Sequence, residues 1–289
     1  MKKAISVITA MTMAVALTAC GTSTSTSDTT SGTATSSKSS ETSESSSDAG
    51  AATVEDIETV KDRGSLIVGI TDFEPMDYKD DDGNWIGFDA DLATAFAEKL
   101  GVDVEFVEIE WDNKILELDS GSIDCVWNGM TLTDEVTSSM DCSNPYCNNA
   151  QTVILPMDKA DEYKDIESMK DLSFAVEVGS AGEEQATANE LNYTAVANQA
   201  NALMEVSAGT ADAAIIDSLM AAAMVGEGTS YEDLTYTINL NSEEYGVGFR
   251  KGSDLRDELN TFLKESYDDG TIDKIAEEYG VSAAIVEQK

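Results

Sequence analysis

The sequence contains no histidine. Histidine is the most frequent general acid–base group in enzymes and a common ligand of zinc, so its absence argues against most hydrolase and metalloenzyme mechanisms. The acidic turn Asp80–Asn84 resembles a calcium loop only superficially, because in the EF-hand register Gly83 would place Tyr78 at the first ligand position. We therefore expect neither a bound metal ion nor a cofactor.

Basic residues are also scarce. The chain has 17 Lys and Arg against 56 Asp and Glu, which gives a formal net charge of −39 at pH 7. Such a surface repels the phosphates of nucleic acids, so nucleic acid is excluded as a partner. The acidity itself is interpreted as a source of solubility.

Only four cysteines are present, one of them Cys20. The remaining three, Cys125, Cys142 and Cys147, allow at most one disulfide among themselves, and Cys142 and Cys147 are the nearest pair in sequence. Cys125 lies within an apolar run, which favours a small buried side chain. No spacing of these cysteines is typical of a metal site.

Long apolar runs are missing as well. The segment Ala4–Thr18 follows the basic start of the chain but is shorter than the ~20 residues that span a bilayer. We interpret residues 1–19 as a signal peptide. The ending Leu17-Thr18-Ala19-Cys20 resembles a bacterial lipobox, which implies cleavage before Cys20 and acylation of its thiol. Ordinary secretion with Cys20 left free is the alternative.

Residues 20–53 are dominated by Ser, Thr, Gly and Ala and contain hardly any large apolar side chain. A segment of this composition cannot offset its ordering entropy by burial. We expect it to be a disordered, lipid-anchored tether for the domain that follows.

From residue 54 onward, strand and helix patterns alternate, which predicts βαβ units and parallel sheets. In the first block, strands are predicted at Leu66–Ile70, Val102–Val107 and Ile123–Trp127, and helices at Ala90–Leu100, with Asp89 as N-cap, and Trp111–Leu118. In the second, strands are predicted at Thr152–Leu155, Ser173–Val178, Tyr193–Ala197 and Ala213–Ile216, and helices at Gly182–Asn189, Asn198–Val206 and Ser218–Val225. The chain ends with strands at Thr235–Leu240 and Tyr245–Arg250 and amphipathic helices at Asp254–Tyr267 and Thr271–Tyr279.

The stretch Cys125–Tyr146 is the most informative. It starts as an apolar strand, turns at Gly129 and exposes hydroxyls, and the carboxyl end of a strand is where open α/β sheets bind ligands. Eight fragments occur in a characteristic order: Gly69 with Phe73–Tyr78, Gly87–Leu92, Trp111 with Leu118–Asp124, Gly129–Thr133, Ser143–Tyr146, Val178–Glu183, Gly209 with Asp212–Asp217, and Tyr245–Lys251. Together they resemble the solute-binding proteins, family 3 type, of polar amino-acid ABC importers.

This resemblance covers the chain from residue 54 to its end and implies a fold. The fold is α/β and two-lobed, periplasmic-binding-protein-like of type II, with two crossover hinge strands. Residues 54–147 would form the first part of lobe 1, 148–242 lobe 2, and 243–289 the return to lobe 1.

The resemblance also implies a role. The chain would be the substrate-binding lipoprotein of an ABC importer, anchored through lipid to the outer face of the cell membrane, as in Gram-positive bacteria. Its partners would be a small ammonium-bearing ligand, such as an amino acid or amine, and the permease and ATPase subunits, and we expect a monomer.

Site residues follow from the matching motifs. Phe73 and Trp111 fall where the family sandwiches the ligand side chain, although an aromatic residue is also a common core residue. Gly129 and Thr131 match the positions that meet the ammonium and carboxylate of an amino acid. Trp127 lies within a strand and is assigned to the core.

Second-lobe candidates come from two further motifs. Ser180 and Ala181 belong to a glycine turn that precedes a helix, where free N–H groups favour a carboxylate. Asp217 matches the family's acid for the α-ammonium, and an N-capping role is its alternative. Asp72 is a weaker acidic candidate.

One position departs from the family pattern. The family places an arginine that grips the α-carboxylate where this chain has Val136, which cannot form a guanidinium fork. Two explanations stay open. Either the carboxylate is held by Thr131, by the backbone of Ser180–Gly182 and by Lys114, or the ligand has no α-carboxylate and is a cationic amine or another small polar molecule.

Two other functions share this fold. A dehydratase acting on prephenate-like acids would need a positioned acid or base and anion-binding arginines, and no site arginine can be placed here. A ligand-sensing extracellular module is the second alternative, and neighbouring genes for a permease and an ATPase distinguish transport from sensing.

Overall fold

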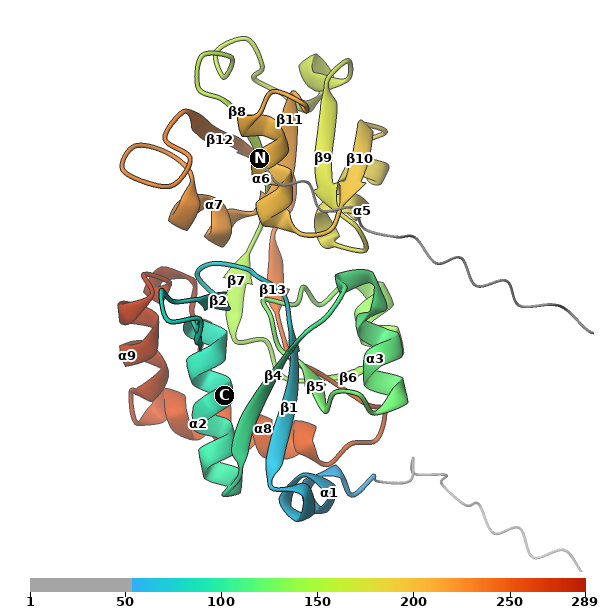
Figure 1. Ribbon diagram of the computed structural model, residues 1–289, viewed down its shortest axis with the longest axis vertical. Helices are drawn as coiled ribbons and strands as arrows, with labels where there is room; N and C mark the ends of the chain where they lie inside the picture. The colour runs from blue at the N-terminus through green and yellow to red at the C-terminus, as the bar shows by residue number, and fades with distance from the viewer. Residues whose placement is uncertain (1–53) are drawn as a thin grey trace, which may run out of the picture. The chain divides into compact units, whose positions relative to one another are not determined.

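The computed structural model describes residues 54–289, coloured from blue to red in Figure 1. The predictions of a signal peptide at 1–19, a lipidated Cys20 and a tether at 20–53 lie outside these residues. In the described part, no helix has both the length and the apolarity that crossing a membrane requires.

The first lobe is built on a mixed five-stranded sheet. Its strands, in spatial order, are β4 (Asp103–Glu108), β1 (Ser65–Ile70), β5 (Cys125–Val126), β14 (Gly248–Phe249) and β6 (Asp141–Cys142). β1 runs parallel to β4 and β5, whereas β14 is antiparallel to β5 and β6. Parallel strands are covered on both faces, which explains why β1 is an almost uninterrupted apolar run.

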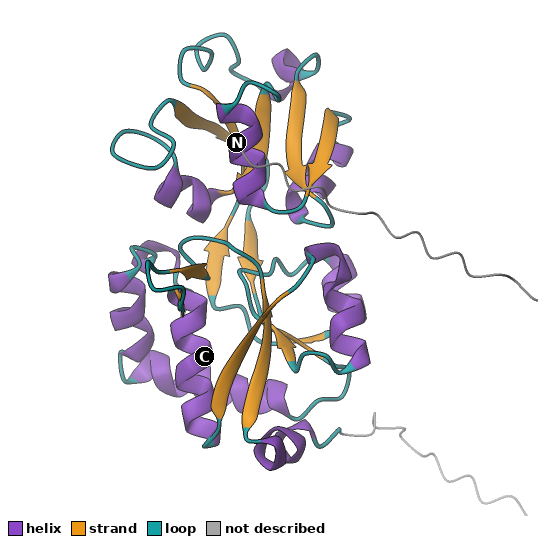
Figure 2. Cartoon of the chain, viewed as in Figure 1, coloured by secondary structure: helices purple, strands orange, loops and turns teal. Residues whose placement is uncertain are grey.

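Helices flank this sheet, as Figure 2 shows. They are α1 (Asp56–Arg63), α2 (Phe88–Leu100), α3 (Lys114–Ser120), α4 (Asp134–Ser139), α8 (Leu255–Asp268) and α9 (Thr271–Glu278), with 3-10 turns at Trp111–Asn113 and Ser282–Ala284. The four apolar residues of α8 that its periodicity turns inward are buried, namely Leu255, Leu259, Phe262 and Leu263. The prediction of an inward apolar face on this helix is therefore confirmed.

The start of α2 corrects one prediction. The helix begins at Phe88 with Gly87 as N-cap, so Asp89 is not the cap but a fully buried residue of the first turn. Gly87 has φ +130°, and a Cβ there would lie 2.2 Å from the carbonyl oxygen of Met76. The entry into the helix therefore requires glycine, and Asp89 is left free to bond elsewhere.

The second lobe has a five-stranded sheet of its own. Its strands are β10 (Asn192–Val196), β9 (Ser173–Glu177), β11 (Ala213–Asp217), β8 (Gln151–Pro156) and β12 (Leu234–Asn239). β9 is parallel to β10 and β11, and β8 is antiparallel to β11 and β12. The accompanying helices are α5 (Ala181–Ala188), α6 (Gln199–Ser207) and α7 (Ser218–Met224), with a 3-10 turn at Ile166–Met169.

The cap predicted for α6 is confirmed. The side chain of Asn198 accepts a hydrogen bond of 2.8 Å from the backbone N–H of Asn201. Such a bond satisfies one of the free donors of the first turn.

Two short strands run between the lobes in Figure 1. β7 (Cys147–Asn149) and β13 (Glu243–Tyr245) pair antiparallel, with Tyr245 opposite Cys147. The prediction of a single strand over Tyr245–Arg250 is wrong, because the chain leaves β13 after Tyr245 and joins the first-lobe sheet at Gly248 as β14. The small hairpin of β2 (Tyr78–Lys79) and β3 (Trp85–Ile86) completes the fold. The two separate sheets and the pair β7 and β13 confirm the predicted two-lobed α/β architecture with two crossing strands.

The described cysteines carry free thiols. Cys125 and Cys147 are buried and Cys142 is half-buried, and none of the three is in a disulfide. Cys142 belongs to β6 and Cys147 to β7, so the pair that is nearest in sequence lies on different sheets. Among residues 54–289, no cluster of three or more Asp, Glu or Cys side chains has the arrangement of a metal site.

Candidate functional site

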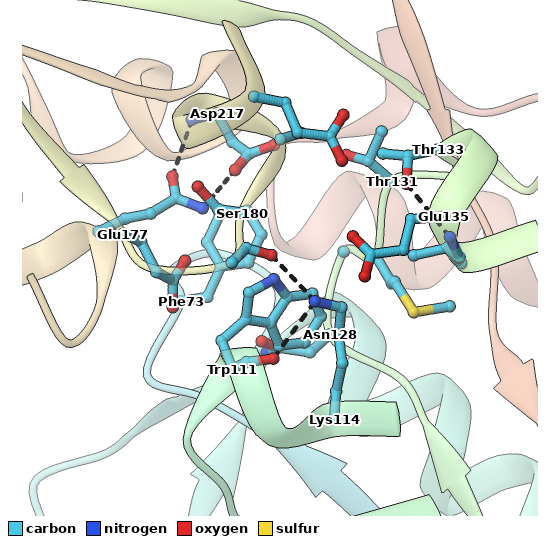
Figure 3. Close-up of a pocket in the computed structure, with 17 residues that line it drawn as sticks. Phe73, Trp111, Lys114, Asn128, Thr131, Thr133, Glu135, Glu177, Ser180 and Asp217 are labelled. Carbon is cyan, nitrogen blue, oxygen red and sulfur yellow. Dashed lines mark hydrogen bonds between the residues drawn. The ribbon is translucent and has the colours of Figure 1, made fainter. Parts of the chain in front are cut away.

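A cavity of ≈ 470 Å³, counting its open part, is lined by side chains of both lobes (Figure 3). First-lobe residues at the cavity include Phe73, Trp111, Lys114, Gly129, Thr131 and Val136. Second-lobe residues include Glu177, Ser180, Ala181, Gln199 and Asp217. Small-molecule sites commonly lie at such junctions between lobes.

Sheet topology explains why these residues meet. In the first lobe, Phe73 follows β1 and Gly129 follows β5, and these two strands are parallel neighbours. In the second lobe, Glu177 ends β9 and Asp217 ends β11, which are also parallel neighbours. The carboxyl ends of parallel strands share one edge of a sheet, so each lobe presents its polar groups to the cavity from that edge.

Of the eight predicted ligand-binding residues, the structure brings seven together around this cavity. They are Phe73, Trp111, Gly129, Thr131, Ser180, Ala181 and Asp217. Asp72 is not among the lining residues and borders a separate groove with Glu74 and Lys79. Burial and the neighbouring charge of Glu108 raise the pKa of Asp72.

Phe73 and Trp111 form the aromatic part of the first-lobe wall. Phe73 is only 3% exposed, begins a tight turn through hydrogen bonds with Asp77, and meets the ring of Tyr245 edge to face at 6.4 Å between centroids. Trp111 is 7% exposed and lies in the 3-10 turn before α3. Both rings therefore border the cavity while remaining packed. Trp127, by contrast, is fully buried against Phe96, as the core assignment predicts.

Gly129 is held at one position by contacts on both sides. Its backbone N–H donates to Asp89 Oδ2 at 2.6 Å, and Tyr146 donates to the same oxygen at 2.7 Å. Gly129 has φ +54°, and a Cβ there would lie 2.4 Å from Cε1 of Phe73. A side chain at this position is therefore incompatible with the observed place of the Phe73 ring.

Thr131 links the cavity to the crossing strands. Its hydroxyl donates to Glu243 Oε1 at 2.9 Å, and the same oxygen accepts from Asn149 at 2.6 Å and Gln151 at 2.8 Å. Glu243 and Asn149 belong to β13 and β7. The polar wall of the cavity is thus continuous with the strands that connect the lobes.

Asp217 is 4% exposed and surrounded by neutral donors. Oδ1 accepts from Tyr245 at 2.6 Å, from Gln151 at 3.0 Å and from Asn149, and Oδ2 accepts from Gln199. Burial, together with the charge of Glu243, raises the pKa of Asp217 to about 7 despite these hydrogen bonds. Asp217 precedes α7, but its side chain makes no capping bond, so the N-cap alternative is not what the structure shows.

Glu177 is a second buried acid at the cavity. It is 3% exposed, and its Oε1 atom has no hydrogen-bond partner among the described residues. Burial and the neighbouring charge of Asp217 raise the pKa of Glu177 to about 8. Two buried carboxyl groups therefore lie near each other, which disfavours their joint ionisation.

Lys114 supplies a positive charge opposite these acids. Its Nζ donates to the carbonyl oxygens of Gly179 at 2.9 Å and Trp111 at 3.3 Å, and it lies 4.8 Å from the centre of the Trp111 ring (Figure 3). Burial lowers the pKa of Lys114, while the charges of Glu135 and Glu177 oppose that shift. The bond to Gly179 joins a first-lobe side chain to the second lobe and leaves one ammonium proton unused.

Comparison with known proteins shows which family the chain resembles over most of its length. The model of the bacterial extracellular solute-binding proteins, family 3, matches residues 66–282. The chain belongs to this family. Its location outside the cytoplasm follows, and its two-lobed fold is that of periplasmic amino-acid-binding structures.

Two similar proteins are named for the amino acids that they bind. The arginine-binding extracellular protein ArtP of Bacillus subtilis (strain 168) is 32% identical over 226 residues, which cover 74% of this chain and 85% of that protein. The L-cystine-binding protein TcyJ of Escherichia coli (strain K12) is 28% identical over 228 residues, covering 77% and 85%. The crystal structure of AncCDT-1, an ancestral amino acid-binding protein and precursor of cyclohexadienyl dehydratase, has a TM-score of 0.72 and 36% identity, covering 78% and 99%.

The helix α5 of this solute-binding protein begins at the cavity. The hydroxyl of Ser180 caps it by accepting from Glu183 N–H at 3.2 Å, and the carboxylate of Glu183 accepts from Gly179 N–H at 2.7 Å. Two donors near the helix start are therefore already used. Ala181 and Gly182 carry the remaining free N–H groups of the first turn.

Val136 lies at the same cavity and is 3% exposed. It packs with Trp111, Met130 and Met140 in a small apolar cluster, so this wall of the solute-binding protein is uncharged. The acids Glu135 and Glu184, both exposed, also line the cavity. Acidic groups therefore outnumber basic ones around the ligand space.

Several cavity residues are absent from the sequence-based candidates, notably Glu177 and Gln199. Glu177 ends an otherwise apolar strand directly before the Gly179 turn, and a charged residue in that place is a usable signal for a site. Gln199 follows the N-cap Asn198, and only the packing of α6 against β11 brings it to Asp217. No pattern in the sequence predicts that contact.

Proposed function

We propose that this family 3 solute-binding protein captures an amino acid, or a related small ammonium-bearing solute, between its lobes and delivers it to the permease of an ABC importer. The observation that carries the proposal is the buried carboxylate of Asp217 in a cavity lined by both lobes. Buried charges are retained where they meet an opposite charge, and an ammonium group supplies one. The names of the arginine- and cystine-binding relatives support the same ligand class.

In this proposal the ligand ammonium binds Asp217 and the backbone carbonyl of Gly129, and its side chain packs between Phe73 and Trp111. Lys114 receives a carboxylate with its unused proton, supported by Thr131 and by the free N–H groups around Ser180 and Ala181. Val136 contributes no charge to this contact. A ligand without an α-carboxylate is the alternative form of the same proposal.

Isothermal titration decides between the two forms. An amino acid and its decarboxylated amine are titrated into the wild type and into Lys114→Gln. If Lys114 holds a carboxylate, the wild type prefers the amino acid and the variant loses that preference. Equal affinities for the two ligands in the wild type defeat the carboxylate account and leave the amine form.

The setting of the domain is part of the proposal. We propose cleavage after residue 19, lipidation of Cys20, and a tether over 20–53 that holds a monomeric domain at the outer face of the membrane. The domain would comprise residues 54–147 and 243–289 as one lobe and 148–242 as the other. Metabolic labelling with a palmitate analogue tests the anchor, since Cys20→Ser abolishes labelling and releases the protein.

A dehydratase activity is the second candidate, because AncCDT-1 is a precursor of such an enzyme. Its prephenate-like substrates carry two carboxylates, whereas this cavity has several acids, one lysine and no arginine among its lining residues. Electrostatic repulsion therefore favours the binding role. Incubation with prephenate and arogenate and measurement of aromatic product separates the two functions.

A further inference from the structure

Glu177 lines the cavity and has a buried carboxylate oxygen, Oε1, that lacks a hydrogen-bond partner among the described residues. Five buried side-chain atoms lack a partner among the described residues, on Asp56, Asp77, Asp89, Trp127 and Glu177. Of these five, only Glu177 lines the cavity between the lobes. A buried carboxylate oxygen without a donor is costly, and a ligand donor removes that cost.

The contacts of Asp217 leave little room for it to take the whole charge of a ligand. Three donors, from Tyr245, Gln151 and Asn149, already point at Oδ1, and Gln199 points at Oδ2. A carboxylate offers about four lone-pair sites, so Oδ2 accepts one further bond. Glu177, in contrast, keeps a whole oxygen free.

The charges of the cavity point the same way. Glu177 and Asp217 are two buried acids. Lys114 is the one basic side chain among the lining residues, and it forms no ion pair with any described acid. A zwitterionic ligand with a neutral side chain adds no net charge and leaves one buried acid uncompensated. A ligand with a second cationic group compensates both.

We propose that Glu177 contacts the ligand and accepts hydrogen bonds from a second cationic group, so that the site selects a basic amino acid, or the diamine derived from it, over neutral amino acids. This inference rests on the proposed function and adds the class of ligand and the residue that recognises its second cationic group. Asp217 takes the α-ammonium, and Glu177 takes the cationic end of the side chain. The contact is a charge-assisted hydrogen bond to a buried carboxylate, and such bonds are stronger than those between neutral groups.

The ionisation of Glu177 supports this assignment. Its pKa of about 8 arises first from burial and then from the charge of Asp217, while Gln199 and Lys114 act in the opposite direction. Glu135 and Glu184 line the same cavity and add negative charge. A bound cation favours the ionised form, so binding near neutral pH releases protons from the acids of the site.

The test compares ligands of nearly equal shape and different charge. Arginine is paired with citrulline and lysine with norleucine, and each is titrated calorimetrically into the wild type, Glu177→Gln and Glu232→Gln. Glu232 is exposed and does not line the cavity, so its variant controls for the loss of one negative charge. Thermal unfolding verifies that each variant is folded, and Glu177→Leu replaces Glu177→Gln if the latter is not.

We expect the wild type and Glu232→Gln to prefer a basic ligand over its neutral partner by about tenfold or more, the effect of one charge-assisted bond. In Glu177→Gln that preference disappears while the neutral ligand binds as before. Titration in buffers of different ionisation enthalpy should also show fewer protons released by the variant.

Two results overturn the inference and leave the proposed function intact. In one, neutral ligands bind the wild type as tightly as basic ones. In the other, Glu177→Gln weakens both members of a pair equally, which means that Glu177 shares the α-ammonium with Asp217. If no amino acid or amine binds the wild type at all, the proposed function itself fails.

Discussion

The phenol of Tyr245 donates a hydrogen bond of 2.6 Å to Oδ1 of Asp217, which joins a strand between the lobes to an acid of the cavity. Tyr245 ends β13 and is fully buried, and Glu243 on the same strand contributes to the raised pKa of Asp217. Asn149 on β7 also donates to Asp217. A ligand charge at Asp217 therefore acts directly on both crossing strands, the elements about which lobes of this kind close.

Replacement of Asp217 by Asn should weaken binding of an ammonium ligand. The substitution removes a charge-assisted contact of about 1.5–3 kcal/mol, which corresponds to roughly 10- to 150-fold in affinity. The side chain keeps its size, so we expect the fold to remain. Calorimetric titration gives the affinity and circular dichroism the unfolding temperature, with the exposed Asp233→Asn as control. Unchanged affinity removes Asp217 from the binding site.

The stability of the ligand-free protein should fall as the pH rises from about 4 to about 8. Glu177 and Asp217 have pKa values of about 8 and about 7 in the folded chain, above the values near 4 of the unfolded chain. Within this window the folded state holds protons that the unfolded state has released, so raising the pH favours unfolding.

Glu177→Gln separates this effect from general charge repulsion. Loss of one such proton reduces the pH slope by at most about 1.4 kcal/mol per pH unit. Urea unfolding at several pH values measures the slopes for the wild type, Glu177→Gln and Glu232→Gln. Identical slopes for all three would show that Glu177 titrates normally in the folded protein.

Alanine at Gly129 should damage both the site and the fold. The new Cβ would lie 2.4 Å from the Phe73 ring and 3.1 Å from Tyr245, in a backbone conformation that favours glycine. We expect a loss of about 1–3 kcal/mol in stability and weaker ligand binding, because the ring has to move.

Gly121→Ala is the matched control for this variant. Gly121 has φ +79°, but a Cβ there has no neighbour within 4 Å. It therefore bears the backbone strain without the contact with an aromatic ring. Chemical unfolding and titration of both variants test the difference, and equal losses would contradict a steric role for Gly129.

Motifs and periodicity predict much of this molecule. Strands and helices follow from apolar runs and caps, such as Asn198 before α6, because these signals are local. The ordered fragments that resemble the family also predict seven residues that the structure brings to one cavity. Residues that follow different strands can be predicted to share a site, because the carboxyl ends of neighbouring parallel strands lie at the same edge of a sheet.

The misses have a common physical cause, since each depends on contacts between distant segments. Asp89 has the composition of a helix cap, but the close approach of Gly87 to Met76 starts the helix earlier. The run Tyr245–Arg250 has the pattern of one strand, but its ends pair with different sheets. Glu177 is hidden in the pattern of a core strand, and only the arrangement of both lobes shows that its oxygen has no partner.

Gly179 offers a direct test of contact between the lobes. It has φ +70°, and a Cβ there would lie 2.8 Å from Cα of Asp112, so Gly179→Ala forces the two lobes apart at this point. The carbonyl of Gly179 also accepts from Lys114, and that bond should lengthen. We expect weaker ligand binding through a faster dissociation rate, because closure is what retains the ligand.

The control for this last variant is Gly209→Ala, with φ +72° and open space around a Cβ. Stopped-flow dissociation, followed by tryptophan fluorescence, compares both variants with the wild type. Of the three tryptophans in the chain, Trp111 lines the cavity. If Gly179→Ala and Gly209→Ala release ligand equally slowly, the approach of Gly179 to Asp112 does not limit closure. A faster release confined to Gly179→Ala shows that close contact at this turn keeps the ligand between the lobes.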